Sequence, residues 1–161
     1  MDDILSLNSS TNTTDYNCAG FALGTFKWYE PQSWDILSDF KVNEMFEGSV
    51  ADLLEDFPNL AAIDKLEDAP EETDVVGFRI STRDTLRAPD DEMVEWNNMV
   101  EREEVWDFHF ILRTKGKWYH KAGARDIAEF TGSLDEKDEW PADRYNYYGK
   151  IAWFTRTGVA A

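Results

Sequence analysis

The sequence predicts an α+β fold in which a helix near the N-terminus packs on an antiparallel sheet, within one domain of 161 residues. Three observations predict it. Apolar residues recur at helical spacing after Cys18, apolar and polar residues alternate over 105–113, and a turn after this segment leads into a second strand-like segment. With 42% hydrophobic and 14% aromatic residues, a chain of this length buries a core without disulfides.

The N-terminal helix is expected to begin near Cys18. Residues 15–17, Asp-Tyr-Asn, offer cap chemistry, and Pro31 is expected to end the helix. Residues 1–14 are rich in Ser, Thr and Asn, and we expect them to form an extended, flexible lead-in.

The segment 105–113 is expected to be a strand with an apolar even face and a mostly polar odd face. Lys115 and Gly116 form a plausible two-residue turn, so residues 117–122 return as the paired strand. This register places His120 on the same face as His109, diagonally displaced from it. One residue inserted into the turn would move His120 to the other face.

The rest of the sequence predicts further helices and strands, including a helix in an acidic segment. Residues 44–74 contain eleven acidic residues and one base, Lys65, and are expected to form an acidic helical insert whose helix ends before Pro58. We also expect strands at 75–80 and 145–154 and a helix at 93–100.

Composition excludes several classes of function. The formal net charge of −17 disfavours direct binding to nucleic acid. One cysteine and two histidines rule out an intrachain disulfide and a cysteine zinc cluster, and we expect no metal or cofactor. No apolar run is long enough to span a membrane, and the N-terminus lacks the features of a signal peptide, so we expect a cytoplasmic protein.

The cysteine and the two histidines suggest nucleophilic catalysis. Cys18 at a helix start is the candidate nucleophile, His109 its base, and His120 the group that orients the base. The backbone N–H of Cys18 and a polar group from Asn17 or Asp15 are candidates for stabilising an oxyanion. This arrangement requires the Cys18 sulfur to lie within hydrogen-bond reach of His109, or one rotamer away from it.

Two sequence blocks resemble the papain-like cysteine hydrolases of the NlpC/P60 type. The first is Asn-Cys-Ala-Gly-Phe-Ala-Leu-Gly at 17–24. The second combines Asp-Phe-His-Phe at 107–110 with Gly-Lys-Trp-Tyr-His-Lys-Ala-Gly at 116–123. Together they cover about a quarter of the chain. Ala122 departs from the proline expected in the closer relatives, and the acidic segment has no counterpart in the family.

The resemblance implies a papain-like fold and assigns the three catalytic roles to Cys18, His109 and His120. It implies an amide hydrolase that acts through an acyl-enzyme on a peptide-like substrate: a peptide, an isopeptide or a peptidoglycan stem peptide.

A non-enzymatic function is the alternative. Cys18 is then a small buried hydrophobe, and the chain is an acidic binding or inhibitor protein, phage-encoded, that engages a basic host surface. Residues 105–127 carry a local charge of +3 within the acidic chain. This basic hairpin either steers an anionic substrate or complements the acidic segment, and we favour the second interpretation.

Overall fold

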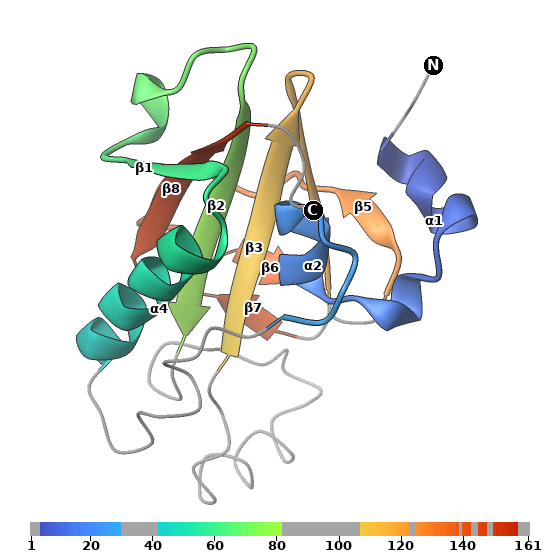
Figure 1. Cartoon of the computed structure of the whole chain (residues 1–161), viewed down its shortest axis with the longest axis horizontal. Helices are drawn as coiled ribbons and strands as arrows, with labels where there is room; N and C mark the ends of the chain where they lie inside the picture. Colours follow the sequence, from blue (N-terminus) through green and yellow to red (C-terminus); the bar gives the residue numbers. More distant parts are fainter. Residues whose placement is uncertain are drawn as a thin grey trace, which may run out of the picture.

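A six-stranded antiparallel sheet organises the molecule, with the strand order β1-β8-β2-β3-β4-β5 (Figure 1). The structure is a computed structural model that describes residues 4–29, 42–81, 107–122, 125–138, 140–142, 145–147 and 150–157. The predicted α+β class and antiparallel sheet are confirmed. A second, two-stranded antiparallel sheet joins β6 and β7.

The described part of the chain contains both helical segments and strands, in the order given by their residue numbers. The helical segments are η1 Ile4–Ser6, α1 Leu7–Ser10, η2 Thr13–Asp15, α2 Cys18–Leu23, α4 Val42–Asp56 and η3 Leu66–Asp68. The strands are β1 Leu60–Ile63, β2 Asp74–Ser81, β3 Asp107–Thr114, β4 Lys117–Lys121, β5 Ile127–Glu129, β6 Trp140–Ala142, β7 Tyr145–Tyr147 and β8 Ile151–Arg156.

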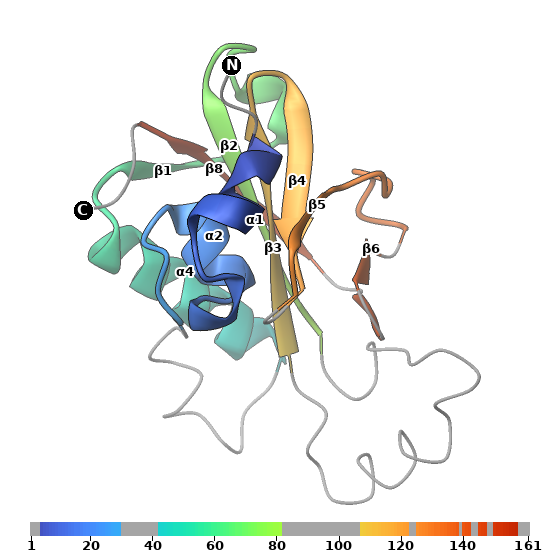
Figure 2. The same ribbon diagram turned by 90° about the vertical axis from the view of Figure 1, so that its right-hand side faces the viewer.

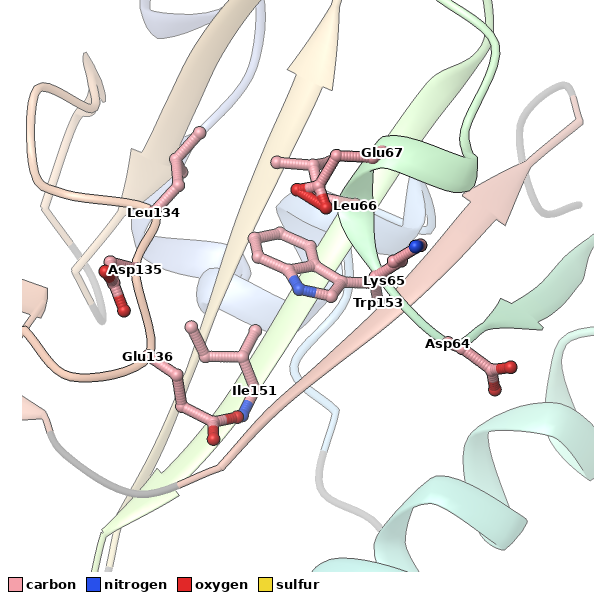
Figure 3. Close-up of a pocket in the computed structure, with 9 residues that line it drawn as sticks. All are labelled: Asp64, Lys65, Leu66, Glu67, Leu134, Asp135, Glu136, Ile151 and Trp153. Carbon is pink, nitrogen blue, oxygen red and sulfur yellow. The ribbon is translucent and has the colours of Figure 1, made fainter.

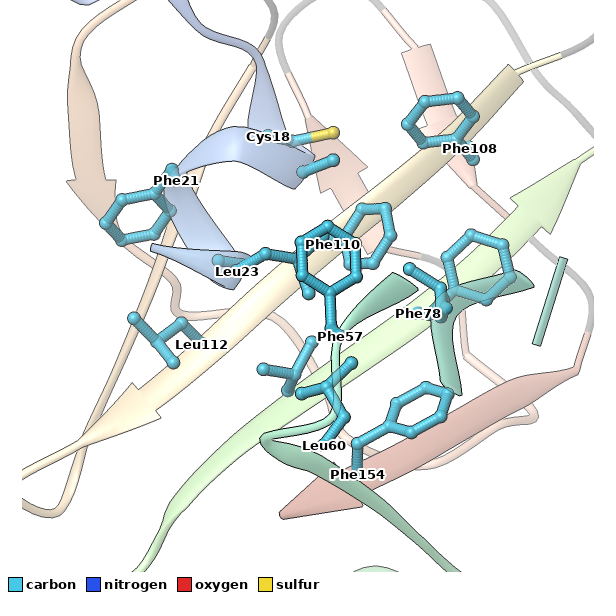
Figure 4. Close-up of a cluster of buried hydrophobic side chains, with 14 of the residues drawn as sticks. Cys18, Phe21, Leu23, Phe57, Leu60, Phe78, Phe108, Phe110, Leu112 and Phe154 are labelled. Carbon is cyan, nitrogen blue, oxygen red and sulfur yellow. The ribbon is translucent and has the colours of Figure 1, made fainter. Parts of the chain in front are cut away.

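The two faces of the large sheet are covered by different elements. Helices α2 and α4 lie on one side, which we call the helical face, and β6 lies on the other, the aromatic face (Figure 2). The core on the helical face contains Cys18 and Phe21 of α2 together with Phe108, Phe110 and Leu112 of β3 (Figure 4). The core on the aromatic face consists of Val75, Ile111, Phe130, Trp140 and Trp153.

Helix α2 begins at Cys18 as predicted but ends well before Pro31. Gly24 adopts a left-handed conformation with φ of 78°, and its N–H donates to the carbonyls of Gly20 and Phe21. This is a glycine cap, and it turns the chain back over the short helix. Of the aromatic residues after Gly24, Tyr29 packs against the helical-face core from this returning segment, whereas Phe26 and Trp28 are exposed. Phe26 still makes an edge contact with Tyr16 at 5.3 Å between ring centroids.

The N-terminal lead-in forms short helical turns, whereas the sequence predicted an extended segment. Asn8 of α1 explains how these turns are held: its side chain donates to the Ile127 carbonyl at 3.0 Å and accepts from the Ile127 N–H at 2.8 Å. The amide thus extends the edge strand β5 by a pair of backbone-like hydrogen bonds. Sequence periodicity does not reveal such a contact, because its two partners are 119 positions apart.

The odd face of β3 carries mostly polar residues as predicted, but His109 and Ile111 on it are buried while Arg113 is half-buried. Ile111 is fully buried and His109 is 2% exposed, because Phe130 and Trp140 from later in the chain cover them. The expected strand at 145–154 is divided into β7 and β8, which belong to different sheets. The strand expected at 75–80 is confirmed within β2, and the helix before Pro58 within α4. The expected helix at 93–100 lies outside the described residues.

Candidate active site

Asn17 caps helix α2 and fixes the position of Cys18. Its Oδ1 accepts the Gly20 N–H at 3.0 Å and the Tyr29 N–H at 3.3 Å, and its Nδ2 donates to the Tyr29 carbonyl at 2.8 Å. The predicted cap is therefore present, and the amide also clamps the returning segment. Because both ends of the amide are engaged, Asn17 serves to position the helix, and the predicted oxyanion role has no support from these contacts.

Asp15 is exposed in η2, where its Oδ1 accepts a long hydrogen bond of 3.4 Å from Asn12 Nδ2. An ionised carboxylate only accepts hydrogen bonds, so it does not stabilise an oxyanion. The stabilising donors for a reaction at Cys18 would have to come from backbone N–H groups.

The two histidines meet as the sequence predicted. The Lys115–Gly116 turn connects β3 to β4, with Thr114 opposite Lys117 and Ile111 opposite His120. This register brings His109 Nε2 within 3.1 Å of His120 Nδ1, with the rings edge to face. One imidazole N–H donates to the other ring, so the pair is a hydrogen bond between two strands of the sheet.

Burial keeps this histidine pair neutral. It lowers the pKa of His109 to about 3, and the charge of His120 contributes in the same direction. Burial also lowers the pKa of His120, whose ring packs on Phe130 at 5.2 Å between centroids. His109 in turn contacts Trp140. A strongly lowered pKa makes His109 a weak proton acceptor at neutral pH.

Cys18 lies on the opposite side of the sheet from this pair. Its side chain is 5% exposed and belongs to the helical-face core, on the same side as Phe108 and Phe110 (Figure 4). Successive residues of a strand point to opposite faces, so the packing of Phe108 and Phe110 under α2 turns His109 away from it. The structure joins His109 to His120 and does not bring Cys18 to either ring.

Lys121 is a buried basic residue on the face of Cys18, and sequence reasoning did not assign it a role. Its side chain is fully buried, its Nζ donates to the Tyr16 carbonyl, and the ammonium lies 4.5 Å from the centroid of the Tyr16 ring. Burial lowers the pKa of Lys121, while the negative charges of Cys18 and Asp126 oppose that shift. The ammonium is thus within electrostatic range of the Cys18 sulfur.

The sequence did contain a signal for this placement. His120 and Lys121 are neighbours in one strand, so they must face opposite sides of the sheet. A register that pairs His120 with His109 therefore sends Lys121 toward the face on which α2 lies. The face that α2 covers is the apolar even face of β3, which carries Phe108, Phe110 and Leu112.

Comparison with protein-family models, curated proteins and solved structures gives no match to this chain. Within the residues that the structure describes, no group of three His, Cys, Asp or Glu side chains is arranged to hold a metal ion. No helix in the described part of the chain is long and apolar enough to cross a membrane.

Proposed function

We propose that the chain is a thiol-dependent amide hydrolase of papain-like character in which Cys18 is the nucleophile and Lys121 is its charged partner. One observation carries the proposal: the capped start of α2 places Cys18 on the same face as a buried lysine, whose pKa is lowered by burial against the opposing charges of Cys18 and Asp126. A cation beside a thiol favours the reactive thiolate. The blocks that resemble NlpC/P60 enzymes include both residues.

In this proposal Lys121 accepts and returns the proton that the reaction moves. Transfer of the Cys18 proton to the Lys121 amine gives the thiolate and ammonium pair, and the thiolate attacks the carbonyl carbon of an amide to form a tetrahedral intermediate. When the tetrahedral intermediate collapses, the C–N bond breaks and the Lys121 ammonium gives a proton to the departing amine. The acyl group remains on Cys18 as a thioester. Water then hydrolyses the thioester, and Cys18 recovers its proton. A peptide, an isopeptide or a peptidoglycan stem peptide fits this chemistry.

The histidine pair has a structural role in this proposal. The Lys115–Gly116 turn sets the register of β3 and β4, which holds Lys121 on the helical face, and the contact between His109 and His120 joins the two strands on the opposite face. The histidines thus contribute to the packing of the sheet and exchange no proton with Cys18.

Alkylation of the single cysteine tests the proposal directly. We expect iodoacetamide to modify Cys18 rapidly near pH 7 in the wild type, and Lys121→Met to slow this reaction at least tenfold by removing the charge that stabilises the thiolate. His109→Gln should leave the rate within about twofold. Mass spectrometry over pH 6–9 gives the rates, and Cys18→Ser provides the blank.

Two results would overturn this assignment. If His109→Gln slows alkylation as strongly as Lys121→Met while near-ultraviolet circular dichroism shows an intact fold, the base is histidine. If native Cys18 reacts only after denaturation, the thiol is a core side chain and the chain is no thiol hydrolase.

A binding function is the second candidate, and it has an observation of its own. Within the described part of the acidic segment, most carboxylates are exposed, among them Glu67, Asp68, Glu71 and Glu72. Exposed carboxylates concentrated on one stretch suit a basic protein partner. Replacing these four residues by lysine should weaken association with such a partner and leave Cys18 alkylation unchanged.

A further inference from the structure

A cavity of about 550 Å³ lies between the segment 64–67 and the segment 134–136 (Figure 3). Its volume is within the range of roughly 300–1,000 Å³ found for ligand pockets. Trp153 and Ile151 of β8 line it; Trp153 belongs to the core of the aromatic face, and Ile151 packs against that core. The cavity is therefore on the opposite side of the sheet from Cys18, and its function is independent of the proposed hydrolase.

The floor of the cavity is apolar. Leu66, Leu134, Ile151 and Trp153 form it, and in Figure 3 the indole of Trp153 occupies the centre. Trp153 is 8% exposed and packs against Trp118 at 5.7 Å between ring centroids, so its position is fixed by its neighbours. A floor of this kind accommodates an aliphatic chain better than a compact hydrated ion.

The rim of the cavity is acidic. Asp64 and Glu67 lie on one side, Asp135 and Glu136 lie on the other, and Lys65 is the one basic residue that lines it. All five are exposed at the surface. Acidic residues on both sides of an apolar floor complement a ligand that has an aliphatic stem and a cationic head.

The wall formed by 134–136 is held in place from inside the molecule. Arg79 is fully buried, and its guanidinium donates to the carbonyls of Glu136 at 2.6 Å and Asp138 at 2.8 Å. Glu136 Oε2 also accepts the Ile151 N–H at 2.8 Å, which ties the wall to the floor. A rim that is ordered before binding loses less conformational entropy when a ligand arrives.

We propose that this cavity binds an arginine or lysine side chain presented by a basic peptide segment. The aliphatic stem packs on Leu66 and Trp153, and the cationic head lies between Glu67 on one side and Asp135 and Glu136 on the other. A polyanion is repelled by this rim. A hydrated divalent cation gains nothing from the apolar floor, so charge and shape together favour the peptide.

Titration with a short basic peptide tests the proposal. We would measure binding of acetylated, amidated Arg-Gly-Arg-Gly-Arg by calorimetry at low salt and follow the indole N–H of Trp153 by NMR. The wild type should bind saturably with a shift at Trp153. The variant Glu67→Gln/Asp135→Asn should bind at least tenfold more weakly, and Lys65→Gln should bind more tightly. The same peptide with citrulline in place of arginine should not bind.

A matched variant separates this pocket from the general acidity of the chain. Glu47→Gln/Glu55→Gln removes the same charge from exposed residues of α4, on the helical face, and should change affinity less than twofold. Equal weakening in both double variants would mean that only net charge attracts the peptide, and the proposal would fail. It would fail equally if neither the arginine peptide nor its lysine counterpart perturbs Trp153. Cys18 alkylation should be the same in every variant.

Discussion

At the scale of single residues, His109 links the stability of the fold to pH. Its pKa in the native state is about 3, against an ordinary value of 6.5. The unfolded chain therefore takes up a proton below pH 6.5, whereas the native chain does so only near pH 3. The contribution of His109 to the free energy of unfolding is fully present above pH 6.5. It is lost as the pH falls toward 3, by about 1.4 kcal/mol per pH unit.

Urea unfolding at pH 7 and pH 4.5 measures this link. We expect the wild type to lose about 2–3 kcal/mol more than His109→Gln over this interval, because glutamine keeps a polar partner for His120 but does not titrate. Comparing the two proteins cancels the protonation of the many carboxylates, which both share. An identical loss in both would mean that the imidazole at 109 is not the titrating group.

At the scale of elements, the turn between β3 and β4 controls which residues meet. Lys115 and Gly116 have φ of 52° and 79°, the left-handed pair that a two-residue hairpin requires. A Cβ added at Gly116 meets no atom within 4 Å, so its cost is purely conformational. We expect Gly116→Ala to destabilise the fold by about 1 kcal/mol.

A substitution at the neighbouring Lys115 should stabilise the fold. Lys115 holds a positive φ without being glycine or asparagine, so Lys115→Asn should stabilise the hairpin by a few tenths of a kcal/mol. Thermal melts of both variants at equal salt measure the two effects. Stabilisation by Gly116→Ala, or loss of stability in Lys115→Asn, would contradict the turn geometry described above.

These elements also show which parts of the structure local sequence can predict. The register of β3 on β4 follows from alternation and a two-residue turn, and the start of α2 follows from the Asn17 cap. The end of α2 does not follow, because Gly24 ends the helix while apolar spacing continues beyond it. Trp140, packed on Phe130, covers His109, so the burial of this histidine depends on a contact between distant segments.

At the scale of the whole molecule, the candidate site depends on which sheet face each helix covers. The sequence correctly paired His109 with His120, and the apolar even face of β3 is the face that α2 covers. The predicted triad required Cys18 beside His109 on the odd face, and this requirement conflicted with the alternation of the strand. Lys121 differs from His120 by one position and therefore lies on the face of α2.

The acidic segment belongs to this scale as well, because a net charge of −17 acts on the whole fold. Arg113 of the basic hairpin contacts the segment through the backbone carbonyls of Pro70 at 2.8 Å and Thr73 at 3.1 Å. These contacts need no carboxylate. Among the described residues, Asp74 does form an ion pair with Arg156 at 2.8 Å, so this carboxylate has a structural role.

Reversing four exposed charges separates a binding surface from a structural one. Replacing Glu67, Asp68, Glu71 and Glu72 by lysine changes the net charge from −17 to −9. If the carboxylates mainly repel one another, the variant should be at least as stable as the wild type at low salt. The wild type should gain more stability from about 0.01 M to 1 M salt, since the Debye length falls from about 30 Å to about 3 Å. Unfolding midpoints across this range decide the matter: a variant that is markedly less stable at low salt would show that these carboxylates pair with the basic hairpin and hold the fold together.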